Sequence, residues 1–148
     1  MAKWMIRSSA IAAVPPEAIS ALYVDPSTWG NWGHNTRWAR ARGAVVEGSV
    51  VDVKAGYGKV YPVLMRRVIA NRSVECEVRP PGMLVETTFS VEPADGGCEV
   101  EHTISVSGTF SGITKLIGLD RLYVRLLRKE IRQVIALAEV TRTAAEPP

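Results

Sequence analysis

The stretch that decides the fold is residues 98–142, CEVEHTISVSGTFSGITKLIGLDRLYVRLLRKEIRQVIALAEVTR. Its first part alternates, with Cys98, Val100, His102, Ile104 and Val106 on one side and polar residues on the other, which predicts a strand with one buried face. From Ile113 to Arg142 the apolar residues recur at helical spacing and share one arc. The stretch therefore predicts a half-buried strand followed by an amphipathic helix of about 30 residues, roughly 45 Å long.

Upstream of this stretch the pattern is that of successive strands joined by short turns, which favours antiparallel pairing. The predicted strands are Met5–Ala13, Trp38–Ala44, Ser49–Ala55, Lys59–Ile69, Ser73–Val78, Leu84–Val91 and Cys98–Ser107. Pro62 interrupts the fourth strand, which predicts a bulge or an unpaired position there.

Two short helices are predicted between the first and second strands. Pro16 and Glu17 are typical of a first helical turn and predict a helix over Glu17–Val24. Asp25-Pro26 repeats the signal for a second helix that carries Trp29 and Trp32. The chain is thus expected to be one α+β domain over residues 1–148, with a disordered tail at 143–148 and a curved seven-stranded antiparallel sheet wrapped around the long helix.

Composition excludes several classes. The 148 residues carry a net charge of only +3, and no aromatic residues interleave with the basic ones as in nucleic-acid binders. No apolar run is long enough to span a membrane, and no metal, phosphate-loop or hydrolase signature is present. The two cysteines, Cys76 and Cys98, are expected to be buried free thiols. A cytoplasmic protein without metal or cofactor, nucleic-acid partner or stable membrane insertion is expected.

The order of elements is the helix-grip arrangement, and two segments carry a family resemblance. These are IAAVPPEAI at residues 11–19 with DPSTWGNW at 25–32, and VEPADGGCEVEHTISVSG at 91–108. The chain resembles the START-like (SRPBCC) superfamily, close to its polyketide cyclase/dehydrase and lipid-transport branch. The resemblance implies a cavity between sheet and long helix that takes a small hydrophobic molecule of lipid, polyketide or aromatic type.

Three functions follow as hypotheses. The first is binding or carrying of such a ligand. The second is a cyclase- or dehydratase-type enzyme on a polyketide-like or aromatic substrate. The third is an interaction protein with a collapsed cavity. We rank the carrier first, because few polar groups are expected inside.

The enzyme hypothesis depends on His102 and Asp120, the candidate catalytic residues. His102 lies on the apolar side of its strand, where it acts either as an acid/base or as an ordinary core histidine. Asp120 falls within the apolar arc of the last helix, where it either faces the cavity or favours the helix dipole as an early-turn acid. The two form an acid–base pair if the fold brings them together.

The candidate ligand-binding residues share an expected place on the cavity side of the sheet, on the last helix or at the cavity rim. Trp29 is expected in the core, and Trp32 and His34 at the rim. The full set is Trp32, His34, Tyr61, Met65, Cys76, Thr87, Phe89, Val100, His102, Ile104, Leu116, Asp120, Tyr123 and Leu127. Tyr23, Tyr61 and Tyr123 offer hydroxyls to a ligand.

The last helix also has two surface rows. Arg121, Arg125, Arg128, Lys129 and Arg132 form a basic stripe, interpreted as a solvated face. Leu119, Leu122, Leu126 and Leu137 lie outside the main apolar arc, which predicts either a homodimer interface or cover by the short N-terminal helices.

Overall fold

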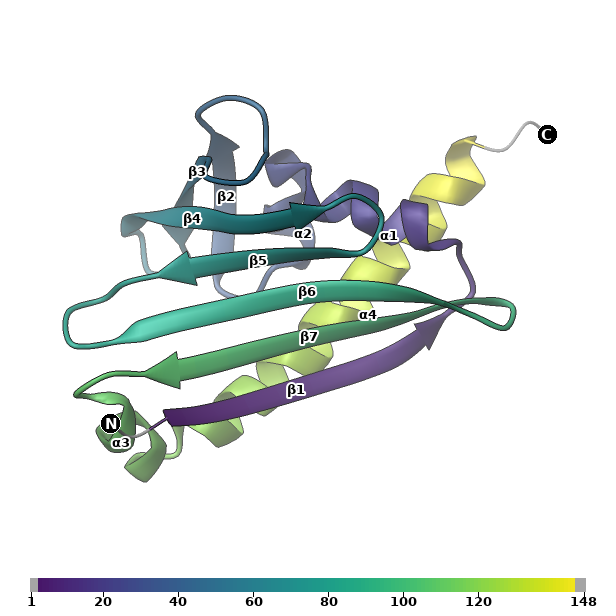
Figure 1. The fold of residues 1–148 in the computed structure, drawn as a ribbon. Helices are drawn as coiled ribbons and strands as arrows, with labels where there is room; N and C mark the ends of the chain where they lie inside the picture. The colour runs from purple at the N-terminus through teal and green to yellow at the C-terminus, as the bar shows by residue number, and fades with distance from the viewer. Residues whose placement is uncertain (1–2, 146–148) are drawn as a thin grey trace.

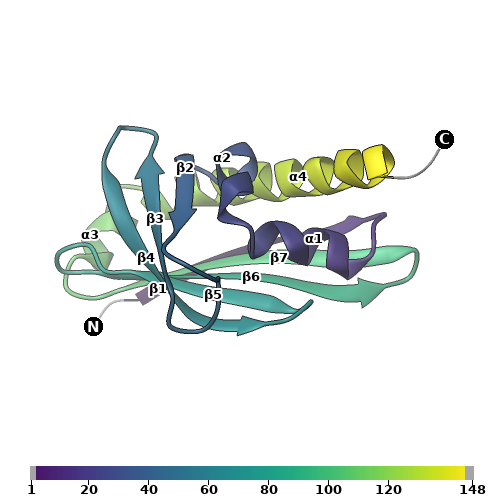
Figure 2. The same cartoon turned by 90° about the horizontal axis from the view of Figure 1, so that it is seen from above.

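The computed structural model describes residues 3–145 and has one seven-stranded antiparallel sheet with all its helices on one side (Figures 1 and 2). The strands are β1 (Lys3–Ala12), β2 (Thr36–Ala41), β3 (Val50–Ala55), β4 (Val60–Ile69), β5 (Ser73–Val78), β6 (Leu84–Ala94) and β7 (Gly97–Ser107). Their order is β1-β7-β6-β5-β4-β3-β2, so that β1 and β2 are the two edges of an open sheet. The predicted strands and their antiparallel pairing are confirmed.

Figure 2 shows that β2, β3 and β4 rise toward the helices, which gives the sheet its curvature. Pro62 lies opposite Asp52 of β3, and the pairing of β4 with β5 begins only at Leu64. Pro62, which has no N–H to donate, therefore needs no partner on β5. The register shift in β4 occurs between Met65 and Arg67 and not at the proline.

The helices between β1 and β2 are α1 (Pro16–Tyr23), the 3₁₀ turn η1 (Pro26–Thr28) and α2 (Trp29–Trp32). The Asp25 side chain accepts a hydrogen bond from the Ser27 backbone N–H at 3.1 Å and caps η1. Gly30 lets α2 approach β2, because a Cβ at this position would collide with the carbonyl oxygen of Arg37. This close approach fixes where Trp29 and Trp32 enter the core.

The long helix predicted from Ile113 is in fact two helices, α3 (Ser111–Leu116) and α4 (Leu119–Ala145). The break is at Gly118, whose φ of +83° is the left-handed conformation that ends helices. The prediction of one continuous helix was wrong, and the break has a consequence for packing: Ile113, Leu116 and Ile117 are exposed by 56%, 86% and 70%. These three side chains therefore do not continue the buried apolar face of α4.

The C-terminal half of α4 extends further than expected. The helix continues through residues 143–145, which the sequence assigned to a tail, and the Thr143 hydroxyl donates to the Glu139 carbonyl at 2.9 Å. The rest of that predicted tail lies outside the described residues. α4 packs chiefly along β1 and crosses behind β7 and β6 (Figure 1).

Candidate functional site

The centre of the site is Glu130, a carboxylate on α4 that is only 2% exposed. Its Oε2 accepts two hydrogen bonds from His34, one from the backbone N–H at 2.9 Å and one from Nδ1 at 2.6 Å. Its Oε1 is 2.7 Å from Nδ1 of His102. A buried carboxylate is costly unless its oxygens are satisfied, and here two histidines supply the donors.

His102 is fully buried on β7, opposite Phe89 on β6 and Ser8 on β1. Its Nε2 is 2.8 Å from the Tyr23 hydroxyl of α1. A chain of hydrogen bonds thus runs from Tyr23 through His102 and Glu130 to His34, and it joins α1, β7, α4 and the loop after α2. His34 is the outer end of this chain, with a side chain that is 20% exposed.

One proton arrangement satisfies every group. Nδ1–H of His102 donates to one oxygen of Glu130 and Nδ1–H of His34 to the other, while Nε2 of His102 shares its hydrogen bond with the Tyr23 hydroxyl. Both nitrogens of His102 are then occupied. Within residues 3–145, Nε2 of His34 has no hydrogen-bond partner. It is thus the one ring nitrogen of these two histidines that remains available to another molecule.

The electrostatics agree with this arrangement. Burial alone would raise the pKa of Glu130, but the hydrogen bonds and charges of His102 and His34 outweigh it and lower the pKa to about 2. Burial likewise opposes the charged form of His34, and the hydrogen bond and charge of Glu130 reverse this and raise its pKa above 6.5. Burial, followed by the nearby Glu130 charge, holds the pKa of Tyr23 well above 10. Glu130 is therefore an anion and Tyr23 a neutral phenol at physiological pH.

These shifts predict a pH dependence of stability. Glu130 contributes stability above pH 4.5, which is lost as the pH falls through about 2. The loss is on the order of 3 kcal/mol, because one pKa unit corresponds to about 1.4 kcal/mol. His34 contributes stability below pH 6.5, which is lost as the pH rises through its raised pKa. The free energy of unfolding, measured by urea denaturation, should be highest between these limits. His34→Gln should remove the alkaline decline and leave a smaller acid decline, because His102 alone then lowers the pKa of Glu130. An unchanged alkaline decline would contradict the assignment.

Aromatic rings fill the interior on one side of the hydrogen bonds that link Tyr23, His102, Glu130 and His34. Trp32 is 1% exposed, and its ring centroid lies 5.7 Å from Tyr23, 5.3 Å from Phe89 and 6.0 Å from His102. Trp29 adds a further edge-on contact with Trp32 at 6.3 Å. Trp29 is in the core as expected, but Trp32 is too, and its expected place at the rim was wrong. α2 packs against β2 and α4, and Phe89 of β6 reaches Trp32 from the sheet, so this part of the interior is packed with side chains.

The other end of the same face is less covered. Val85 lies opposite Val106, and Thr87 opposite Ile104, so both point to the helix side of the sheet. They are nevertheless half-exposed, as is Val78 opposite Val85. The Trp32 end of the covered face is thus sealed, whereas at the Val85 end Val78, Val85 and Thr87 stay partly exposed although Ile104 and Val106 of β7 are buried.

Two half-buried tyrosines, Tyr61 and Tyr123, lie close enough to influence each other, and Tyr123 packs on the same cluster as Val85. The Tyr123 ring packs edge-on against His34 with centroids 5.4 Å apart. Burial raises the pKa of Tyr61 to about 12, with smaller contributions from Tyr57, Tyr123 and Glu130. Burial also raises the pKa of Tyr123. Both half-buried hydroxyls are therefore protonated at neutral pH and able to donate or accept hydrogen bonds.

The remaining predicted site residues divide into three groups. Met65, Cys76, Val100, Ile104 and Leu127 are buried in the core, and the Cys76 thiol lies 3.7 Å from the Met65 sulfur. Asp120 is half-buried in the first turn of α4, and Leu116 is 86% exposed on α3. The break at Gly118 separates Leu116 from the arc that covers the sheet, and the carboxylate that pairs with His102 is Glu130, not Asp120.

Glu130 was missed in the sequence. A signal was present, because residue 130 lies on the helix face of Leu127 and Val134, three residues before it and four after it. A charged residue flanked in this way by buried apolar neighbours indicates a carboxylate that faces the core and needs partners. Tyr23 was recognised only as a hydroxyl for a ligand; in the structure its partner is His102.

Two searches of the described chain gave negative findings. Among residues 3–145, no group of three or more His, Cys, Asp or Glu side chains is placed to hold a metal ion. In the same range no helix is long and apolar enough to cross a membrane. Cys76 and Cys98 are both buried and free.

Solved structures with this fold are numerous but distant in sequence. One is the di-domain ARO/CYC StfQ from the steffimycin biosynthetic pathway, with a TM-score of 0.76 and 10% identity over 95% of this chain and 52% of StfQ. Protein NE0264 from Nitrosomonas europaea has a TM-score of 0.71 and 13% identity over 94% of this chain and 96% of its own. Ara h 8.0201 has a TM-score of 0.70 and 12% identity over 94% and 99%. At such identities these likenesses establish the fold alone.

Family comparison is more specific. No curated protein matches the chain, but the family model described as polyketide cyclase / dehydrase and lipid transport matches residues 3–140. This range includes every element from β1 to most of α4, together with Tyr23, His34, His102 and Glu130. The chain therefore belongs to the polyketide cyclase/dehydrase and lipid transport family, as the resemblance of its N-terminal and β6–β7 segments implied.

Proposed function

We propose that the chain binds a small, mainly apolar molecule of aromatic, polyketide or lipid type between α4 and the half-exposed end of the sheet. The observation that carries the proposal is that Val78, Val85 and Thr87 point to the covered side of the sheet and yet remain half-exposed. An apolar ligand at this place would remove them from water. Tyr61, Tyr123 and His34 would supply the few polar groups that orient it.

The family and its structural neighbours support this class of ligand. The family description includes polyketide cyclisation and lipid transport, and StfQ is an ARO/CYC protein of a biosynthetic pathway. The sealed aromatic half around Trp32 restricts the ligand to the Val85 end. Of the predicted ligand-binding residues, the proposal retains Tyr61, Thr87, Tyr123 and His34 as direct contacts.

A filling substitution tests the site. Val85→Trp should place an indole in the proposed site and weaken binding of the neutral naphthalene dye prodan at least tenfold, measured by its fluorescence. Thr88→Trp is the matched control, because residue 88 lies on the same strand but points to the opposite face. Prodan affinity should be unchanged in the control. Equal affinities of the two variants would contradict the proposed position.

A second candidate is acid–base catalysis on the same bound molecule, of cyclase or dehydratase type. It is favoured by the orientation of His34, whose Nδ1 is held by Glu130 while Nε2 is free to face a ligand. A carboxylate that fixes the tautomer of a histidine in this way makes the other nitrogen a general base. His102, with both nitrogens engaged, would act in this scheme as a positioning residue and not as the group that touches substrate.

One variant separates the two candidates. His34→Gln removes one direct contact but keeps a polar side chain at the site, so it should weaken prodan binding by no more than about fivefold in either case, because the apolar contacts remain. If the chain is an enzyme, the same variant loses turnover of the aromatic or polyketide-like compound that native mass spectrometry finds bound. If the chain is a carrier, that compound is released unaltered by both proteins.

The predicted homodimer remains a proposal. Of the leucine row, Leu122 is 50% exposed, whereas Leu119, Leu126 and Leu137 are half-buried and Leu137 packs against the aromatic core. The row is thus partly accounted for within one chain. The same native mass spectrum would report the oligomeric state.

A further inference from the structure

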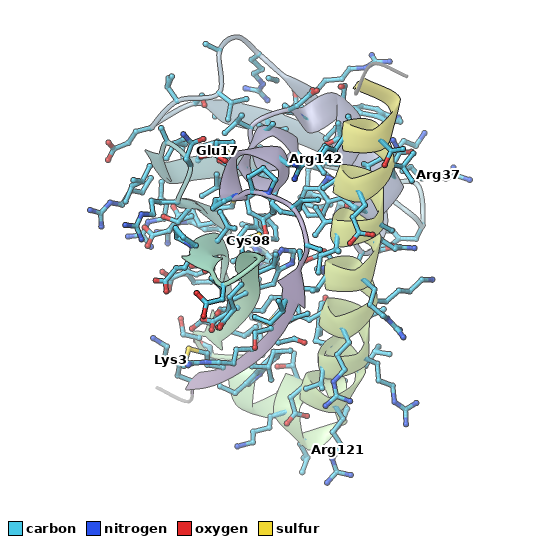
Figure 3. All side chains as sticks on the ribbon, turned by 90° about the vertical axis from the view of Figure 1, so that its right-hand side faces the viewer. Lys3, Glu17, Arg37, Cys98, Arg121 and Arg142 are labelled. Carbon is cyan, nitrogen blue, oxygen red and sulfur yellow. The ribbon has the colours of Figure 1, made fainter. Side chains whose placement is uncertain are left out.

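A groove of about 550 Å³ lies outside the proposed site, between β1 and the outer side of α4. It is lined by Ser8, Ser9, Ala10, Arg125, Arg128, Ile131 and Arg132. Figure 3 views the molecule from the side on which β1 and α4 run next to each other, with Lys3 at the start of β1 and Arg121 near the start of α4.

The groove follows the backbone edge of β1. Ser8, Ser9 and Ala10 are consecutive, and consecutive strand residues point to opposite faces, so a groove that touches all three runs along the edge. β1 is the first strand of the sheet order and pairs only with β7. An edge strand presents unpaired N–H and C=O groups that another extended chain can bind.

The opposite wall of the groove is a row of arginines. Arg125, Arg128 and Arg132 are exposed, and among the described residues none of them has a carboxylate partner. Other arginines of the chain do have one, such as Arg42 with Asp52 at 2.7 Å and Arg66 with Glu86 at 2.6 Å. No acidic residue lines the groove. Its charge is therefore uncompensated and complementary to an anionic partner.

The outer face of β1 has a different character. Met5 and Ile11 project from the side of the strand that no helix covers and are 55% and 64% exposed, and they share this side with Lys3, Arg7 and Ser9. A strand added at this edge would have one face beside the arginines and the other face level with these apolar side chains. A strand added here is thus favoured if its side chains toward α4 are acidic and those on its other face, beside Met5 and Ile11, are apolar.

We propose that this edge binds an extended segment of a partner protein in which acidic and apolar residues alternate. Its backbone would pair with β1, as in other cases of strand addition. Its acidic side chains, about 6.7 Å apart at every second residue, would meet Arg128 and Arg132, which are four residues or about 6 Å apart along α4. A second copy of this chain is a poor occupant, because pairing of two β1 strands would bring their arginine rows and Arg7 side chains together.

A pair of peptides of equal composition tests the proposal. A short fluorescent peptide in which glutamate alternates with valine should bind at least tenfold more tightly than one with its glutamates grouped at one end, measured by fluorescence anisotropy. N-methylation of alternate amides in the first peptide should abolish the difference, because it prevents strand pairing without changing charge. Equal binding of the alternating and grouped peptides would overturn the proposal.

Variants locate the site. Arg128→Glu combined with Arg132→Glu should weaken binding of the alternating peptide at least tenfold. Arg121→Glu combined with Lys129→Glu, an equal charge change on the same helix at two exposed residues outside the groove lining, should alter it less than twofold. If inorganic phosphate or vesicles of anionic lipid displace the peptide at equal concentrations of charge, the groove is a general anion site and the proposal fails. None of these residues contributes to the Val85 end of the sheet, so prodan binding should stay constant in every variant.

Discussion

Glu130→Ala is expected to lower the free energy of unfolding by about 3–5 kcal/mol, the cost of removing one partner from a buried ionic pair. The substitution leaves Nδ1–H of His102, fully buried, and both donors of His34 without an acceptor. Each unsatisfied buried donor costs free energy of its own. Urea denaturation followed by circular dichroism would measure the loss.

The control for this variant lies on the same helix. Glu139→Ala removes an exposed carboxylate at a helical position nine residues further along α4, and it should change stability by no more than about 0.5 kcal/mol. A loss below about 1 kcal/mol for Glu130→Ala would mean that the histidines find other partners in the variant. Because a domain is stable by only about 5–15 kcal/mol, the expected loss is a large share of the total.

Trp32→Ala is expected to cost about 3–5 kcal/mol as well, but through a cavity and not through lost hydrogen bonds. The ring touches Tyr23, Phe89 and His102 from one turn of α2, and its Nε1–H donates to the Thr28 hydroxyl at 3.0 Å. Removing the indole leaves an apolar space at the centre of the sealed half. The neutral dye prodan should then bind at two places instead of one, which its fluorescence titration would reveal.

Another tryptophan provides the comparison. Trp38 on β2 is half-buried and stacks with the Arg40 guanidinium at 4.6 Å. Trp38→Ala should therefore cost clearly less than Trp32→Ala, because fewer packed atoms lose their neighbours. Similar costs for the two substitutions would show that the aromatic cluster collapses around the missing ring.

The stability losses expected for Glu130→Ala and Trp32→Ala arise in the same part of the molecule. The Tyr23–His102–Glu130–His34 chain and the Trp32 cluster hold α1, α2, β7 and α4 together at one end, which leaves the other end of the sheet face half-covered. The buried hydrogen bonds and aromatic packing thus lie at one end of the sheet–helix interface, and the candidate binding site lies at the other. His34 lies at their boundary, with one nitrogen on Glu130 and its ring against Tyr123.

Local patterns alone predicted most of the architecture. The alternation from Cys98 to Val106 and the turn residues between strands predicted seven antiparallel strands, because burial on one face has a period of two along a strand. Pro16 and Pro26 predicted the two helical segments before β2. These signals depend only on neighbours in the chain, so they can be read without knowing what the strands and helices contact.

The partners within the site depended on contacts between distant segments. Residues 23, 34, 102 and 130 come from four separate parts of the chain, and nothing in their spacing indicates that they meet. Helical phase placed Asp120 and Leu116 toward the sheet, but the left-handed Gly118 ended one helix and began another, which turned Leu116 to solvent. Asp120 and Glu130 both lie in α4, so the position of β7 along this helix, and not the break at Gly118, decided which acid reached His102.

The sequence by itself determined the sheet, its one apolar face, the helix that covers it and the presence of a histidine on that face. Only the tertiary structure decided that Glu130 is the partner of His102, that Trp32 fills the core and that the arginines of α4 lie along the free edge of β1. The physical reason is that periodicity reports which residues avoid water, whereas pairing and packing depend on the curvature of the sheet and on where α4 crosses it.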